Sequence, residues 1–156
     1  MYCDHRALRR WRDARPRYTH LVDVVEAVRR VLEGRTDVLL AYVFGSVARG
    51  EARPSSDLDL GVVFRFVPVP RERDRLTTDL EVAAGRRVDL VVLNEAPPLL
   101  THEAIREGRL IVCRDEDERV RFETRATARY LDTRYLRQVQ HRYLRERVDA
   151  RRARSA

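Results

Sequence analysis

A glycine–serine pair followed by two closely spaced aspartates, set between two apolar segments, most constrains the fold of this chain. Gly45-Ser46 lies at the end of an apolar run over residues 38–44, and Asp57-Leu58-Asp59 opens a second run over residues 57–64. Short apolar runs of this kind predict buried β-strands. The glycine turn and the two carboxylates therefore belong to one loop and one strand.

The two aspartates have the spacing of a divalent-cation site. Because side chains alternate along a strand, Asp57 and Asp59 project to the same side, while Leu58 and Leu60 face a core. Two neighbouring carboxylates repel each other unless a cation lies between them. Mg²⁺ is commonly held by one or two carboxylates together with substrate phosphates. An Asp-x-Asp pair alone is also common on solvated surfaces, but its combination with the glycine turn favours a metal site.

The glycine turn itself suits a phosphate group. Gly45 has no Cβ, so a phosphate can approach the backbone closely, and Ser46 adds a hydroxyl donor. A short helix predicted over residues 47–51 would offer free N–H groups to an anion. Arg49 adds a guanidinium that can bind phosphate oxygens. Phosphate and metal together indicate nucleotide chemistry.

A third carboxylate, Asp89, lies in the apolar run of residues 88–93, which predicts another strand. A buried and unpaired carboxylate is costly, so the sequence predicts that Asp89 shares a metal with the first two. The alternative is a strand-end aspartate that reaches water or pairs with Arg86 or Arg87.

These motifs resemble the nucleotidyltransferase superfamily of the polymerase-β type. Gly-Ser-Val-Ala-Arg-Gly-Glu over residues 45–51 and Ser-Ser-Asp-Leu-Asp-Leu over 55–60 resemble, more narrowly, the minimal nucleotidyltransferases, or MNT proteins. Residues 116–132 are similar to the C-terminal helix of the MntA-type antitoxins within that family. The resemblance covers residues 19–131.

The resemblance implies an α/β (α+β) fold: a polymerase-β-like core with a small mixed sheet flanked by helices, and a long C-terminal helical segment. It implies Mg²⁺, in two ions, and ATP as the nucleotide. The implied catalytic and metal-binding residues are Asp57, Asp59 and Asp89. The implied nucleotide-binding residues are Gly45, Ser46, Arg49 and Ser56.

MntA-type antitoxins partner HEPN toxins, which are ribonucleases, and silence them by transferring AMP from ATP to a toxin tyrosine. The resemblance therefore implies an adenylyltransferase antitoxin in a hetero-oligomer with a HEPN toxin. The chain also has little sequence left beyond a catalytic core, which favours a protein as the acceptor. Two alternatives stay open: a small-molecule nucleotidyltransferase that works with an accessory subunit, and a catalytically idle module that neutralises a toxin by binding alone.

Charge divides the 156 residues into three parts. Residues 1–18 carry six Arg and two Asp, and residues 133–156 carry eight Arg, one Glu and one Asp, so the termini sum to +10. The net charge of the chain is +7, which leaves −3 for residues 19–132. We expect a basic N-terminal extension (1–18), one nucleotidyltransferase domain (19–132) and a basic C-terminal helical tail (133–156). Nucleic-acid contact through the basic tails is not favoured, because the catalytic body is acidic.

The sequence has no apolar run long enough to cross a membrane, and its start lacks the apolar stretch of a signal peptide. Its two cysteines, Cys3 and Cys113, have no metal-like spacing. These features predict a cytoplasmic protein without a membrane partner.

Helical periodicity and stop signals predict the remaining elements. The first predicted helix is capped by Thr19 and stopped by Gly34. Further helices are predicted over residues 71–84, 99–107 and 115–148, and a short edge strand over residues 110–113. A stripe of apolar and tyrosine side chains beginning at Tyr130 is compatible either with packing on the domain or with docking of a partner.

Overall fold

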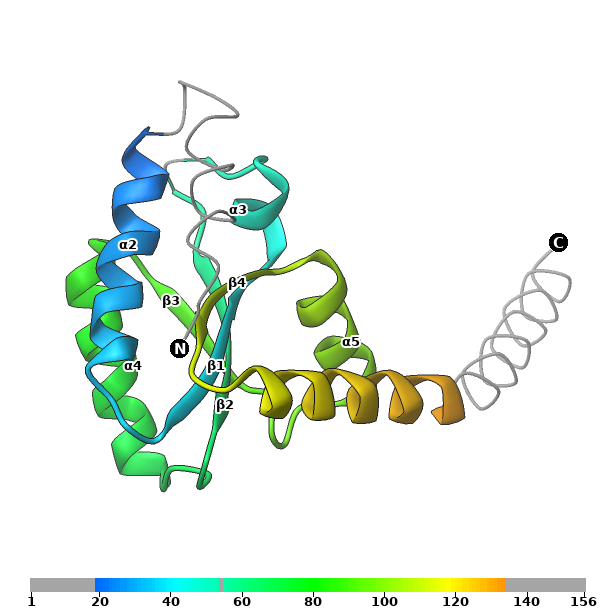
Figure 1. The fold of residues 1–156 in the computed structure, drawn as a ribbon. Coiled ribbons are helices and arrows are strands. Elements are labelled where there is room, and N and C mark those ends of the chain that lie inside the picture. Colours follow the sequence, from blue (N-terminus) through cyan, green and yellow to red (C-terminus); the bar gives the residue numbers. More distant parts are fainter. Residues whose placement is uncertain (1–18, 54, 134–156) are drawn as a thin grey trace, which may run out of the picture.

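A four-stranded mixed sheet forms the centre of the protein (Figure 1). The computed structural model describes residues 19–53 and 55–133. The strands β1 (Val38–Val43), β2 (Leu58–Phe64), β3 (Val88–Val92) and β4 (Arg109–Cys113) lie in the order β3-β2-β1-β4. β1 is antiparallel to both β2 and β4, whereas β2 and β3 are parallel. The predicted mixed sheet and the predicted edge position of the last strand are both confirmed.

Two helices cover one face of the sheet. They are α2 (Thr19–Glu33) and α4 (Pro70–Ala84), which lie side by side in Figure 1. Their apolar stripes pack on alternate residues of β2, so this layer is the larger part of the core. Its fully buried members include Val28, Leu32, Leu58, Leu60, Leu76 and Leu80.

The opposite face is covered by α5 (Pro98–Glu107) and by the C-terminal helix over residues 116–133, drawn yellow to orange in Figure 1. A second apolar cluster includes Leu40, Leu93 and Ala104, with Phe122 of the C-terminal helix packed against it. The hydroxyl of Tyr42 donates a hydrogen bond of 2.9 Å to Oε1 of Glu123. The described part of the C-terminal helix is therefore attached to the sheet.

The alternation along β2 decides which face carries chemistry. Leu58, Leu60 and Val62 pack under α2 and α4, while Val63 belongs to the second cluster. Asp59 and Gly61 share the face of Val63, because side chains alternate along a strand. The Asp59 carboxylate thus lies on the face of α5 and the C-terminal helix.

Helix ends follow the sequence signals closely. Gly34 follows the last residue of α2, and Gly85 ends α4 with a left-handed backbone, φ 63°. Asp115 accepts hydrogen bonds from the N–H groups of Asp117 and Glu118, which caps the C-terminal helix. The predicted helix over residues 99–107 begins one residue earlier, at Pro98, because proline suits the first helical position.

Some predictions fall on other parts of the chain. The extension over 1–18 and residues 134–156 of the predicted tail lie outside the described residues, so the predicted helix is seen only as far as residue 133.

Tyr130, the first residue of the predicted apolar and tyrosine stripe, stacks on His102 of α5, with ring centroids 3.9 Å apart. Within the ranges that the structure describes, we find no helix that combines the length and apolar character needed to span a membrane.

Candidate active site

Gly45 and Asp59 form the centre of the candidate site. The N–H of Phe44 donates a 3.1 Å hydrogen bond to the backbone oxygen of Asp59, which joins the end of β1 to the start of β2. Gly45 then turns with φ 65°, a backbone angle that residues with a Cβ rarely adopt. A Cβ built on residue 45 would lie 2.0 Å from Oδ2 of Asp59. Only glycine leaves room for this carboxylate.

The chain continues directly into the short helix α3 (Gly45–Arg49). The sequence-based start at Val47 is wrong by two residues, because the glycine turn is itself the first helical residue. The N–H groups at a helix start have no intrahelical partner. The residue before α3, Phe44, makes no side-chain capping hydrogen bond to these groups. Gly50 closes the helix with φ 73°.

The parallel pairing of β2 and β3 brings the third carboxylate to the first two. Asp89 is the register partner of Asp59, and residues paired in register across parallel strands project from the same face of the sheet. The hydrogen bond from Leu58 N–H to Arg87 oxygen, 3.0 Å, starts this pairing. Asp57 lies just before β2, two residues from Asp59.

The predicted burial of Asp89 is wrong. Its side chain is exposed, and β3 is an edge strand of the sheet. The cost of burying an unpaired carboxylate therefore does not explain the residue. Its register with Asp59 is the observation that ties it to the site.

Asp59 feels the charge of the other two carboxylates. The pKa of Asp59 is raised above its usual value, first because partial burial disfavours the charged form and then because Asp89 and Asp57 repel it. Arg49 opposes this shift without removing it. A cation bound beside these carboxylates would reduce their mutual repulsion.

The donor set fits Mg²⁺ as a hard cation held by carboxylates and phosphates. Among residues 19–53 and 55–133, no group of three His, Cys, Asp or Glu side chains is arranged to hold a metal by itself. Mg²⁺ does not need such a cage, since one or two carboxylates with substrate phosphates and waters suffice. The pairs Asp57–Asp59 and Asp59–Asp89 supply this number.

Two other predicted nucleotide-binding residues have protein partners. Arg49 forms ion pairs with Glu51, at 2.9 Å, and with Glu107 of α5, at 3.7 Å. The Ser56 hydroxyl accepts a 2.9 Å hydrogen bond from the N–H of Arg53 and so shapes the turn that delivers Asp57. Contact of either residue with a nucleotide stays a prediction.

Sequence reasoning missed Arg109, the first residue of β4. Its Nε donates a hydrogen bond of 3.2 Å to the backbone oxygen of Ala48, near the end of α3. Partial desolvation lowers the pKa of this guanidinium. Arg109 therefore fixes α3 beside the sheet. Its only sequence signal is a lone arginine following Gly108 at the start of an apolar strand.

Comparison with known proteins agrees with this geometry. Residues 26–117 match the family described as Polymerase beta, Nucleotidyltransferase. This chain belongs to the polymerase-β-type nucleotidyltransferase family. The match covers the sheet, the helix α3 and all three carboxylates, so the resemblance stated from the motifs is confirmed, as are the fold class and the assignment to an enzyme family.

A curated relative and two solved structures extend the comparison. The protein adenylyltransferase MntA of Thermococcus cleftensis is 34% identical over 84 residues, which is 54% of this chain and 85% of the relative. A toxin–antitoxin crystal structure with AMP-PNP has a TM-score of 0.70 at 23% identity, covering 77% of this chain and 97% of that one. A tri-AMPylated HEPN toxin of Shewanella oneidensis in complex with MNT antitoxin has a TM-score of 0.65 at 21% identity, covering 78% and 95%. At these identities the two structures establish the shared fold.

Proposed function

We propose that this nucleotidyltransferase is an antitoxin that transfers AMP from ATP to a tyrosine of a HEPN toxin. The observation that carries the proposal is the register of Asp59 with Asp89 beside a Gly45 that leaves no room for a Cβ. This arrangement offers carboxylates for a cation next to backbone N–H groups for a phosphate. The name of the 34% identical relative, a protein adenylyltransferase, supports AMP as the transferred group.

The partner is proposed from the similar structures. Their descriptions name a toxin–antitoxin pair with an ATP analogue and an AMPylated HEPN toxin bound to MNT antitoxin. The exposed positions of Asp57 and Asp89 also support a large acceptor, since the site opens at the rim of the sheet. A cytoplasmic location, where ATP is available, follows from the same proposal.

The roles of the residues follow from their chemistry. The backbone N–H groups of Gly45 and Ser46, with the Ser46 hydroxyl, bind triphosphate oxygens. The tyrosine oxygen attacks the α-phosphorus, a new P–O bond forms, and the bond to the β-phosphate breaks to release pyrophosphate. Asp89, on the edge strand, accepts the tyrosine proton. Positioning and charge neutralisation supply most of the rate enhancement in such transfers.

Asp57 and Asp59 would hold one Mg²⁺ with the triphosphate, and Asp59 and Asp89 would share a second. When bound, these ions neutralise phosphate charge and lower the pKa of the attacking hydroxyl. The raised pKa of Asp59, which comes first from partial burial and then from the repulsion of Asp89 and Asp57, supports this assignment, because a cation would relieve that repulsion.

The decisive experiment uses ATP labelled at the α-phosphate, Mg²⁺ and a purified HEPN toxin. We expect label on a HEPN tyrosine, located by peptide mass spectrometry, and loss of the label with Asp59→Asn. Asp23→Asn, an exposed aspartate of α2, is the matched control and should label at the wild-type rate.

Each other outcome rejects the proposal in a specific way. Tight binding of the HEPN protein without label identifies an idle binding module. Label that appears only on a small molecule identifies the alternative nucleotidyltransferase. Full labelling by Asp59→Asn removes the carboxylates from the mechanism.

A further inference from the structure

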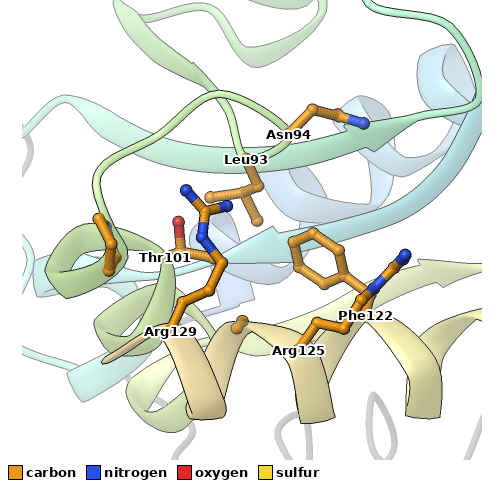
Figure 2. Close-up of a pocket in the computed structure, with 8 residues that line it drawn as sticks. Leu93, Asn94, Thr101, Phe122, Arg125 and Arg129 are labelled. Carbon is orange, nitrogen blue, oxygen red and sulfur yellow. The ribbon is translucent and has the colours of Figure 1, made fainter. Parts of the chain in front are cut away.

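A recess lies on the same face of the sheet as Asp59. It has a volume of about 270 Å³ and is bounded by the segment after β3, by α5 and by the C-terminal helix (Figure 2). Its floor is apolar and includes Leu93, Phe122 and Ala126. We call this recess the Arg125/Arg129 pocket, after the two arginines at its rim.

Arg125 and Arg129 lie one turn apart on the C-terminal helix and both line the pocket. Figure 2 shows Arg129 extending from that helix toward Thr101 and Leu93, with Arg125 rising beside Phe122. The structure gives neither guanidinium an ion pair within residues 19–53 and 55–133. Earlier on the same helix, in contrast, Arg119 pairs with Glu116 and Glu123, and Arg121 pairs with Glu118.

Two like charges one helical turn apart destabilise a helix slightly. Both side chains are exposed, so their charges are available to an anionic ligand, which would also relieve this repulsion. The other polar side chains of the pocket are already used: the Thr101 hydroxyl donates to the Pro97 oxygen at 3.1 Å, and both ends of the Asn94 amide bind the Phe64 backbone at 2.9 Å. The pocket thus offers two cations over an apolar floor.

We propose that this pocket anchors the acceptor protein through an acidic side chain with an apolar neighbour. This inference rests on the proposed function and names the surface by which the acceptor is held. The volume lies below the roughly 300–1,000 Å³ of small-molecule sites, so it suits an anchoring side chain. Arginine forms two parallel hydrogen bonds with a carboxylate, and Arg and aromatic residues dominate binding hot spots.

The charge of the chain argues against two other occupants of the pocket, the chain's own terminal segments and a nucleic acid. Residues 1–18 and 133–156 carry net charges of +4 and +6, so the chain's own ends do not complement two arginines. Residues 19–132 carry −3, which opposes the extended phosphate contacts on which nucleic-acid binding depends. A short acidic segment of another protein, in contrast, can bind through these two arginines alone.

The pocket is connected to the catalytic face through Gly61. A Cβ built on Gly61 would lie 2.9 Å from a methyl group of Leu93, so the pocket floor packs directly on β2. Gly61 is two residues from Asp59 on the same face, a distance of about 7 Å along a strand. A protein held in the pocket therefore lies on the same side of the sheet as the carboxylates.

The test is the double charge reversal Arg125→Glu/Arg129→Glu, with Arg121→Glu as the matched control on the same helix but outside the pocket. Calorimetry measures the Kd for the HEPN protein, and steady-state labelling measures KM and kcat. We expect the double variant to raise both Kd and the KM for the HEPN protein by about tenfold or more. The kcat and the KM for ATP should stay within about twofold, and the control should match wild type.

An unchanged Kd in the folded double variant overturns the pocket assignment while leaving the proposed function intact. A wild-type chain that binds the HEPN protein but does not label it overturns the proposed function alone, since Kd still tests the pocket. If the double variant loses affinity for a single-stranded RNA oligonucleotide but binds the HEPN protein normally, the proposal that a protein occupies the pocket is overturned. A wild-type chain that does not bind the HEPN protein overturns both.

Discussion

Gly45 and the Asp59 carboxylate face each other with no space for a further atom between them. A Cβ on residue 45 would stand 2.0 Å from Oδ2 of Asp59. The contact joins the turn expected to bind phosphate to the carboxylate expected to bind the cation. It explains why glycine is required here by space as well as by its positive φ.

Gly45→Ala should abolish AMP transfer, because the new methyl group displaces the Asp59 carboxylate. We also expect the free energy of unfolding to fall by more than the roughly 1–2 kcal/mol that a left-handed backbone costs an ordinary residue. Gly85→Ala is the matched control. Residue 85 has φ 63° and nothing within 4 Å of an added Cβ, so this variant should lose stability through the backbone conformation alone, without a steric clash. Urea unfolding and labelling measure both effects; equal losses of stability in the two variants would contradict the steric argument.

Asp59→Asn should make the protein more stable at neutral pH while removing its activity. The folded-state pKa of Asp59 is raised, so the folded state binds a proton more readily than the unfolded state. Stability from this group consequently falls as pH rises from the ordinary aspartate value, 3.8, through the raised value. We expect the variant to raise Tm by about 1–3 °C at pH 7, and the difference to shrink as the pH approaches about 4. A lower Tm for the variant at pH 7 would show that the repulsion is unimportant.

Removal of the metal should stop transfer reversibly. A chelator should eliminate labelling, and added Mg²⁺ should restore it, because carboxylates and phosphates cannot otherwise share the site. In the absence of nucleotide, millimolar Mg²⁺ should raise the Tm of the wild-type chain and leave Asp59→Asn unchanged, since ligand binding to the folded state stabilises it. Undiminished labelling in excess chelator would exclude the metal.

Tyr42→Phe should loosen the C-terminal helix from the sheet. The change removes the 2.9 Å hydrogen bond to Glu123, whose carboxylate keeps its 2.8 Å hydrogen bond from Arg119. We expect a loss of about 1 kcal/mol in the free energy of unfolding, with faster amide exchange over residues 116–133. Additive effects of Tyr42→Phe and Glu123→Gln in a double-mutant cycle would indicate that the two side chains are not coupled.

Local pattern was sufficient for the elements that carry the site. The strand after Ser56 alternates Asp59 with Leu58 and Leu60, and this period alone separates a chemical face from a core face. The glycine turn and the helix ends were equally readable, because backbone angles and proline or glycine positions act within a few residues. The start of α3 was misjudged, since a glycine is a weak signal for the first residue of a helix.

Contacts between distant residues could not be read in the same way. The partners of Arg49 include Glu107, and those of Arg109 include the backbone of Ala48. Neither pair has a signature in a chain whose basic residues are all arginine. The exposure of Asp89 likewise depended on which strand forms the edge, a property of the whole sheet.

The sequence by itself determined the residues that we propose for this protein's chemistry: a glycine turn, an alternating pair of aspartates and a third aspartate in a later strand. Only the tertiary structure decided that β3 lies parallel to β2 with Asp89 opposite Asp59, and that α5 and the C-terminal helix enclose a pocket beneath two arginines. The physical reason is the distance along the chain over which each effect acts. Periodicity and turn chemistry act over a few residues, whereas strand order and the fit between helices depend on burying apolar surface across the entire domain.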